Sequence, residues 1–476
     1  MDRKPIKCKW VLKVKRDHTS AITCYKGRLV AKGFSQIPGI NFTETFAPVV
    51  QLETFRTLIA IAAHYKLDIH TMDVVGAYLN GKLNETIYIE QPPGYEDGTN
   101  HVYRLRRPLY GLKQSGAIWN KKLNSEFISL GFTRLIADQY VYIQWNTDGI
   151  VIVAIHVDDM TILASSNTLM SQVKSDLNSK FDIQDLGPVK QILGMEITQD
   201  KTTGSITITQ TQYLKKILER FQMTECHPVT TPLDPNVKLD KTSDDAKLAL
   251  PQLVHEYSAV IGSLNFAAIA TRPDLKYMVH ELSQFMNNPS PIHWTAAKRA
   301  LRYIKGTLNL GITYLPSNLD PHSYSDANWG TNLTDRRSVS GYAIMFGEGA
   351  ISWYSKKQPT VALSTMEAEY MALSNTTREC LWIRELLTEL GIPPNGSTII
   401  NVDNQAAIKF TENSQFHAQS KHIDICHHFI REHIASNEVS VQYCATENNL
   451  ADIFTKALPK AKYKHFAKLL GMTRTT

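Results

Sequence analysis

The stretch VIVAIHVDDMTILAS, residues 151–165, places two adjacent aspartates, Asp158 and Asp159, between two runs of aliphatic and β-branched residues. The two runs predict the strands of a buried hairpin. Aspartate is favoured where a hairpin reverses direction, so a turn is one interpretation of the pair. A metal site is the other, because adjacent carboxylates repel each other unless a cation or solvent compensates them. The rest of the chain has to decide between the two.

A third aspartate, Asp73, ends the strand expected at LDIHTMD, residues 67–73, and Tyr78 follows five residues later. If this strand end faces the tip of the hairpin, three carboxylates converge at one end of a sheet. Such a group suffices for two Mg²⁺ ions, which prefer oxygen ligands and substrate phosphates. Two ions stabilise both the attacking and the leaving oxygen of an in-line phosphoryl displacement. The pattern therefore favours nucleotidyl transfer from a 3′-hydroxyl to an incoming nucleotide.

Composition narrows the class of protein. The 476 residues, 43% hydrophobic and 20% charged, are enough for about three or four globular domains. The six cysteines form no Cys-x-x-Cys pair, which argues against a disulfide framework and a zinc ribbon. No apolar run reaches the about 20 residues of a membrane span, and the charged N-terminus lacks the apolar core of a secretory signal. We therefore expect a cytoplasmic protein with no membrane partner.

The distribution of charge says more than the net charge of +6. The segment HVYRLRRPLYGLKQSGAIWNKK, residues 101–122, carries six Lys and Arg residues, two tyrosines and a tryptophan but no acid. Residues 282–319 and the chain after Asp452 are also free of acids. Cations meet phosphates and aromatic rings stack on bases, so the three stretches together favour a polyanionic partner such as nucleic acid.

The order of expected elements is that of a multidomain α/β and α+β protein. Residues 9–17 and 24–34 predict a hairpin, 53–67 an amphipathic helix, and 118–132 a helix that ends at Gly131. A Pro-rich stretch at 227–245 predicts a loop or linker, and helices are expected from Tyr257 to Thr307. After a second break at 315–323, four strand patterns alternate with helices at 364–390 and 422–436.

The C-terminal pattern offers a second set of acids, one each from a strand, a helix, a strand and a helix. These are Asp326, Glu369, Asp403 and Asp452. Hydrolysis of a phosphodiester by two metal ions requires such a group. Glu367 competes with Glu369, but residues two apart on a helix point about 200° apart, so only one of them faces the site, and the spacing in EYMA favours Glu369.

A histidine-rich stretch, SKHIDICHHFIREH at residues 420–433, leaves two interpretations open. His422 and Cys426 lie one helical turn apart, a spacing that suits a zinc site. The alternative, which we favour, is a helix that packs beside the second α/β sheet.

Several long motifs resemble, in order and spacing, the Pol polyprotein of copia-type LTR retrotransposons. They are Asp73 with Tyr78, LYGLKQSGAIWN at 109–120, HVDD at 156–159 and DLGPVKQILGMEI at 185–197. RLVAKGFSQIPGINFTETFAPVV at 28–50 resembles the fingers of that family, whereas IGSLNFAAIATRPDLKY and AAKRALRYIKGTL resemble its thumb and connection. The four C-terminal acids follow the order of ribonuclease H. The similarity covers nearly the whole chain.

The resemblance implies roles for the acids. Asp73 and Asp158 would be the main metal ligands of a polymerase site, with Asp159 supporting them. Tyr78 would be a steric gate whose ring excludes a ribose 2′-hydroxyl and so favours dNTPs. The second group of acids would hold the metal ions of a ribonuclease H site.

The resemblance also implies nucleotide-binding residues. Arg28 and Lys32 are similar to the basic residues of the fingers, one of which would hold the triphosphate. Tyr110 and Lys113 would lie beside the nucleotide and the template.

Two positions depart from the family pattern. His156 stands where the family usually has Tyr, and Gly116 stands where Pro is common. Neither change removes a metal ligand.

The sequence thus predicts a right-hand polymerase, with fingers and palm at 1–226 and a linker and helical thumb at 227–318, then a ribonuclease H-like domain at 319–460 and a basic tail at 461–476. It would copy RNA into DNA and degrade the RNA strand of the hybrid, with two Mg²⁺ ions per site and Mn²⁺ as a substitute. Its partners would be an RNA template, a DNA primer, the RNA/DNA hybrid and dNTPs. We expect a fragment of a longer polyprotein, located in the cytoplasm and in virus-like particles, with nuclear entry. A decayed or domesticated nucleic-acid-binding protein and a nuclease alone are the alternatives.

Overall fold

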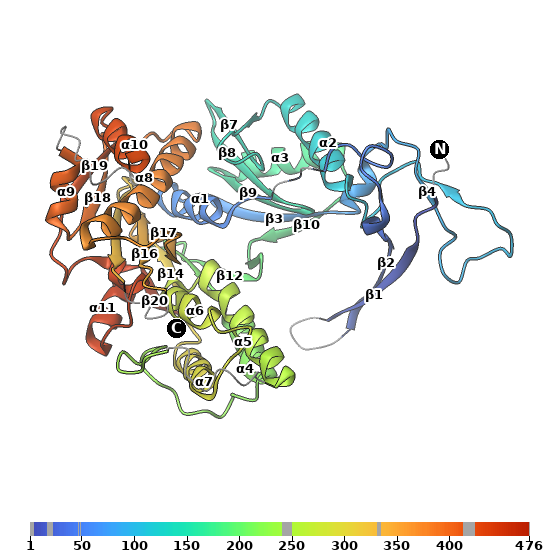
Figure 1. Ribbon diagram of the computed structural model, residues 1–476. Coiled ribbons are helices and arrows are strands. Elements are labelled where there is room, and N and C mark those ends of the chain that lie inside the picture. The colour runs from blue at the N-terminus through green and yellow to red at the C-terminus, as the bar shows by residue number, and fades with distance from the viewer. Residues whose placement is uncertain are drawn as a thin grey trace. The chain divides into compact units, whose positions relative to one another are not determined.

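The computed structural model describes residues 4–16, 22–45, 47, 49–239, 250–330, 335–412 and 424–475 (Figure 1). The chain forms two compact units. The first comprises residues 1–50 and 68–188, and the second comprises residues 51–67 and 189–476. The compact units reflect contacts rather than function, so the domain boundaries predicted from the sequence at 226/227, 318/319 and 460/461 stay predictions.

The first unit is built on an antiparallel sheet of six strands in the order β10-β3-β9-β8-β7-β6. The central strands β8 (Gly149–His156) and β9 (Asp159–Ala164) are almost entirely buried, as their unbroken apolar runs require. Helices α2 (Ser115–Ser129) and α3 (Asn167–Lys180) pack against the sheet. The outer strands are β3 (Asp68–Val74), β6 (Thr133–Arg134), β7 (Val141–Asn146) and β10 (Ile183–Pro188).

Two small sheets complete this unit. The predicted hairpin is confirmed as β1 (Cys8–Arg16) paired with β2 (Ile22–Ala31). Strand β4 (Tyr88–Ile89) pairs with β5 (Tyr103–Arg104). The carbonyl of Tyr110 accepts a hydrogen bond from Ala31 N–H at 2.8 Å, which brings the basic segment 101–122 to the end of β2.

The second unit begins with α1 (Leu52–Tyr65), whose residues 54–63 are all buried. A five-stranded sheet follows, in the order β11 (Gln191–Ile192), β12 (Met195–Gln199), β13 (Ile206–Thr209), β14 (Leu310–Tyr314) and β20 (Met472–Arg474). The helices expected between Tyr257 and Thr307 are α5 (Pro251–Ala270), α6 (Lys276–Ser283) and α7 (Pro291–Gly306), and α4 (Thr211–Arg220) precedes them.

A second five-stranded sheet in this unit has the order β17-β16-β15-β18-β19. Strands β15 (His322–Asn328), β16 (Val339–Phe346) and β17 (Gly349–Lys357) are antiparallel, whereas β18 (Thr398–Val402) and β19 (Val439–Tyr443) continue the sheet in parallel. The long helix α8 (Thr365–Glu389) packs on β15 and β16. Shorter helices are α9 (Gln405–Glu412), α10 (Asp424–Ala435), the 3₁₀ segment η6 (Leu450–Phe454) and α11 (Lys460–Leu469).

This architecture confirms the predicted α/β and α+β class, with a second, mixed five-stranded sheet after the helical region. Residues 227–239 of the predicted linker contain neither helix nor strand, and residues 240–245 lie outside the described ranges. Among the helices that the structure describes, none is both long and apolar enough to span a membrane.

Candidate active sites

The tip of the β8–β9 hairpin is a two-residue turn of Val157 and Asp158, flanked by the pair His156 and Asp159. Val157 has φ of 61°, a left-handed conformation that is strained for a β-branched residue. Its carbonyl accepts a hydrogen bond from the indole N–H of Trp119 at 2.7 Å. The predicted hairpin is therefore confirmed, but only the first aspartate lies in the turn, and the second opens strand β9.

Strand β3 brings Asp73 to the same tip. Asp73 stands opposite Asp159 in the β3–β9 register, and Val74 N–H donates to the carbonyl of Asp158 at 2.8 Å. Asp73 and Asp158 are half-buried, whereas Asp159 is exposed. The backbones of the three predicted ligands thus lie side by side, as the strand pattern required. Among the described residues, their side-chain oxygens do not form a group within 4.8 Å.

A basic and aromatic group adjoins Asp158. The Arg28 guanidinium lies 3.4 Å from an Asp158 carboxylate oxygen and 4.7 Å from the centre of the Tyr110 ring. The rings of Tyr110 and Tyr78 are 4.7 Å apart. Burial and then the charge of Asp158 raise the pKa of both tyrosines, while Arg28 lowers it. Four residues predicted from separate motifs therefore meet at one place.

The two remaining predicted nucleotide-binding residues lie elsewhere along the same segments. Lys113 is exposed, and its ammonium is 4.8 Å from the centre of the Phe42 ring. Lys32 donates its backbone N–H to the Lys7 carbonyl at 2.7 Å. Of the two cations predicted to hold a triphosphate, Arg28 is the one whose side chain reaches Asp158.

The departure at Gly116 has a local steric cause. A Cβ atom added at this position would lie 2.7 Å from the Cβ atom of Ala47, closer than real contacts allow. Ala47 therefore approaches the start of α2 so closely that glycine fits at position 116 where a residue with a Cβ atom would not.

The second set of acids is gathered more tightly. One side-chain oxygen each from Asp326, Glu369 and Asp403 can be chosen so that all three lie within 4.8 Å of one another. Asp326 comes from β15, Glu369 from the first half of α8, and Asp403 from the end of β18. Asp326 and Glu369 are 3% and 6% exposed, so they are desolvated as well as mutually repelling.

This repulsion appears in the protonation equilibria. Burial, with the charges of Asp452 and Asp403, raises the pKa of Asp326 to about 7, although Lys456 and Thr455 lower it. Burial and the same kind of repulsion hold the pKa of Glu369 well above its usual value. Oε2 of Glu369 is buried and has no hydrogen-bond partner in the described part of the chain. Buried carboxylate oxygens that outnumber the nearby hydrogen-bond donors are suitable ligands for a hard divalent cation.

The competition between Glu367 and Glu369 is resolved by the start of α8. Glu367 accepts a hydrogen bond from Leu363 N–H at 2.7 Å, and its own N–H donates to the Ser364 hydroxyl at 3.2 Å. Ser364 thus caps the helix, and the Glu367 carboxylate accepts from the residue that precedes this cap. Glu367 therefore serves the helix terminus, and Glu369 faces the acids.

Asp452 has different partners. Its Oδ1 lies 2.6 Å from Lys456 Nζ and its Oδ2 lies 2.6 Å from Lys462 Nζ, and the side chain is fully buried. The sequence analysis missed both lysines, although the spacing of four between Asp452 and Lys456 is typical of a helical ion pair. It also missed Thr455, whose hydroxyl donates to Asp326, and Thr446, whose hydroxyl donates to Asp403 at 2.8 Å.

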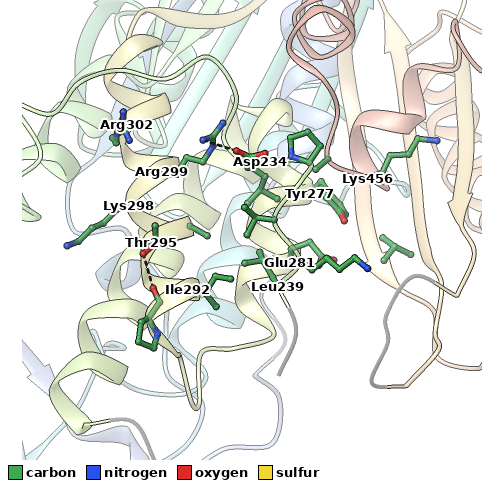
Figure 2. Close-up of a pocket in the computed structure, with 18 of the residues that line it drawn as sticks. Asp234, Leu239, Tyr277, Glu281, Ile292, Thr295, Lys298, Arg299, Arg302 and Lys456 are labelled. Atoms are coloured by element: carbon green, nitrogen blue, oxygen red, sulfur yellow. Dashed lines mark hydrogen bonds and ion pairs between the residues drawn. The ribbon is translucent and has the colours of Figure 1, made fainter. Parts of the chain in front are cut away.

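The acid-free helix α7 lines a cavity of about 1000 Å³ together with residues 233–239 (Figure 2). Arg299 lies 3.5 Å from Asp234, and Arg302 donates to the His227 carbonyl at 2.7 Å. These two arginines therefore hold the segment 227–239 against α7, while Lys298 lies over the Trp294 ring. Lys456 lies at one end of the same cavity.

The structure supports the interpretation of the histidine-rich stretch as a packed helix. Helix α10 packs against α8 and α9, and His427 on it is buried beside Tyr370 and Phe410. His422 of the zinc alternative lies outside the described residues.

The chain was also compared with known proteins. A family model described as reverse transcriptase (RNA-dependent DNA polymerase) matches residues 1–235. The chain is 39% identical over 477 residues to the retrovirus-related Pol polyprotein from transposon TNT 1-94 of Nicotiana tabacum, a match that covers 99% of the chain and 36% of that relative. It therefore spans about a third of the length of this curated relative.

Two further similarities were found. Over 313 residues the chain is 33% identical to a Saccharomyces cerevisiae protein attributed to transposon Ty5-1, covering 65% of the chain and 100% of that protein. The solved structure of a foamy viral protease-reverse transcriptase in complex with dsDNA is 12% identical, with a TM-score of 0.45, over 91% of this chain and 77% of the other.

Proposed function

The chain belongs to the copia-type retrotransposon Pol family, and from this premise we propose that it is an RNA-directed DNA polymerase that also carries ribonuclease H activity. The proposed substrates are an RNA template, a DNA primer and dNTPs, and then the RNA strand of the hybrid. The observation that carries the proposal is the presence of two separate groups of acids, one in each compact unit.

The first group supports nucleotidyl transfer. Asp73, Asp158 and Asp159 lie on adjacent backbones at the tip of one sheet, where solvent and a substrate have access. Arg28 at this tip provides a cation for phosphate oxygens, and the Tyr78 ring beside it is suited to contact a sugar. When dNTPs bind, Arg28 would exchange its contact with Asp158 for one with the triphosphate and so release a carboxylate for a metal ion.

The second group supports hydrolysis of RNA. Asp326, Glu369 and Asp403 would hold a divalent ion, Mg²⁺ or its substitute Mn²⁺, and Thr446 and Thr455 fix two of these carboxylates by hydrogen bonds. A bound ion would supply Lewis-acid stabilisation of the attacking water and the departing 3′-oxygen. Thr446 and Thr455 orient the carboxylates of Asp403 and Asp326. Bulk water is kept away from Asp326 and Glu369 because both side chains are buried.

The test is one reaction on end-labelled RNA annealed to a DNA primer, with dNTPs and Mg²⁺, in which primer extension and RNA shortening are read separately. We expect Asp158→Asn to abolish extension and to leave cleavage, and Asp403→Asn to do the reverse. Removing a single group that stabilises the transition state typically lowers the rate by a factor of about 100–1000, so we expect at least this loss for a metal ligand. Asp148→Asn, at the exposed opposite end of the β7–β8 hairpin, is the matched control and should retain both activities.

Other outcomes select the alternatives. Cleavage without extension in the unmodified chain would favour a nuclease alone. Tight binding of the hybrid with neither product would favour a decayed or domesticated nucleic-acid-binding protein. Loss of both activities from either single substitution would contradict the two-site proposal.

A further inference from the structure

Two lysines set Asp452 apart from the other acids of the nuclease centre. Each of its carboxylate oxygens lies 2.6 Å from one ammonium nitrogen, Oδ1 from Lys456 and Oδ2 from Lys462. The carboxylate is fully buried. Its Oδ2 accepts a hydrogen bond from Lys462, whereas Oδ1 makes an ion pair with Lys456 and accepts no hydrogen bond from the described residues. In the described part of the chain, the group of ligand atoms within 4.8 Å includes the other three acids and leaves Asp452 out.

The lysines are themselves held in place. Lys462 also donates to the Thr446 carbonyl at 2.9 Å, and the Thr446 hydroxyl donates to Asp403, so Lys462 is tied to the rim of the cluster. Lys456 follows Asp452 by one helical turn, and its charge acts on Asp326 and Asp403 as well as on Asp452. Lys462 thus ties Asp452 to Thr446, whereas the charge of Lys456 acts on Asp452 and also on Asp326 and Asp403.

The surroundings of Lys456 are consistent with the contact between its ammonium and Asp452. Its side chain is 36% exposed and lies at the end of the cavity beside α7, and it reaches away from the cavity residues (Figure 2). The Lys456 side chain is thus partly exposed, while its ammonium is paired with a carboxylate that is completely buried. Removal of the ammonium would leave a buried carboxylate oxygen without a cation.

We propose that Lys456 is a resident cation of the nuclease centre, which occupies Asp452 and leaves the free chain with a single divalent-ion site formed by Asp326, Glu369 and Asp403. The role given to Lys456 rests on the proposed nuclease function. It departs from the expectation, implied by the family resemblance, that Asp452 holds one of two ions. An incoming divalent ion would have to displace an ammonium from a buried carboxylate and would be repelled by that ammonium. Lys456 is therefore a positioning residue that controls how many ions the centre takes.

The experiment counts Mn²⁺ bound by the full chain, from the free-ion signal in electron paramagnetic resonance. The parent protein carries Asp73→Asn, Asp158→Asn and Asp159→Asn, so that only the nuclease centre is counted. We expect one Mn²⁺ in this parent and none after Asp403→Asn is added. Adding Lys456→Met instead should raise the count to two, and the second ion should disappear when Asp452→Asn is introduced as well.

Matched variants separate charge from structure. Lys456→Arg keeps the cation and should keep the count at one, as should Lys460→Met, which changes an exposed lysine at the start of α11. A count of two in the parent, or of one in Lys456→Met, would overturn the proposal. If Lys456→Met does not fold, Lys456→Gln, which also removes the cation, takes its place and should bind two Mn²⁺. A count of one in a chain that cleaves no RNA would remove the proposed function but not the ion assignment.

Discussion

At the scale of single residues, the charge state of Asp326 should couple the stability of the metal-free chain to pH. Burial, with Asp452 and Asp403, raises the pKa of Asp326 to about 7. A carboxyl whose pKa is higher in the folded than in the unfolded chain takes up a proton on folding, so its contribution to stability is present at low pH and lost as pH rises through about 7. We expect Asp326→Asn to remove this dependence, and at about pH 8 to increase the free energy of unfolding by about 1–3 kcal/mol.

Urea denaturation in the presence of a chelator, at a series of pH values, measures this effect. Asp335→Asn is the control with the opposite sign. Burial raises the pKa of Asp335, but the Arg337 N–H and Lys357 lower it overall, so its contribution is present at neutral pH and lost in acid. Its effect should be small because the side chain is 36% exposed. An Asp326→Asn variant less stable than the parent at high pH would contradict the assigned cause.

Single residues also show where sequence reasoning stops. The hairpin and the acids at strand ends could be predicted because strand periodicity and turn chemistry are local. The sequence analysis groups Asp452 with the other three acids from their order along the chain. That order does not show that Asp452 forms ion pairs with Lys456 and Lys462. Its engagement by Lys462 depends on where α11 packs, which only the tertiary structure determines.

At the scale of elements, a buried arginine in α1 joins this helix to two of its neighbours. The Arg56 guanidinium is 1% exposed and donates to the carbonyls of Ile351 at 2.6 Å and of Ile269 at 2.8 Å. It also lies 3.9 Å from the centre of the Trp353 ring and pairs with Glu53. One side chain thus joins α1 to β17 and to the end of α5.

Replacing this cation should destabilise the second unit. We expect Arg56→Met to lower the free energy of unfolding by about 3–5 kcal/mol, because buried carbonyls and a carboxylate lose their donor. Arg220→Met, at the exposed end of α4, removes an arginine without such partners and should change stability by less than about 0.5 kcal/mol. Urea titration followed by tryptophan fluorescence compares the two variants, and equal midpoints would show that the Arg56 contacts do not stabilise α1.

The existence of α1 was predictable from its apolar content, but its place was not. The sequence predicts this helix within the fingers and palm region, 1–226, and that assignment stays a prediction. The structure shows which elements bury the helix, namely β13, β14 and β17 of the second compact unit. The apolar content of a helix predicts that the helix is buried, but it does not predict which sheet covers it.

At the scale of the whole molecule, the path of the chain makes the second unit discontinuous. It takes residues 51–67 from the N-terminal half and resumes at residue 189. A fragment of residues 189–476 therefore lacks α1, in which Leu58, Ile59 and Ile61 are completely buried. Each such side chain contributes about 1.5–3 kcal/mol when buried, and a typical domain has only about 5–15 kcal/mol in total.

We therefore expect the fragment 189–476 to lose its cooperative thermal transition, whereas residues 51–67 joined to residue 189 through a flexible Gly/Ser linker should recover it. The linker replaces residues 68–188, and it preserves the natural order of the two segments. The matched control joins a scrambled 51–67 segment through the same linker, which keeps length and composition but not the buried face. Circular dichroism during heating distinguishes the three proteins. Identical transitions in all three proteins would mean that the second unit folds without α1. The burial of this helix would then not stabilise the unit.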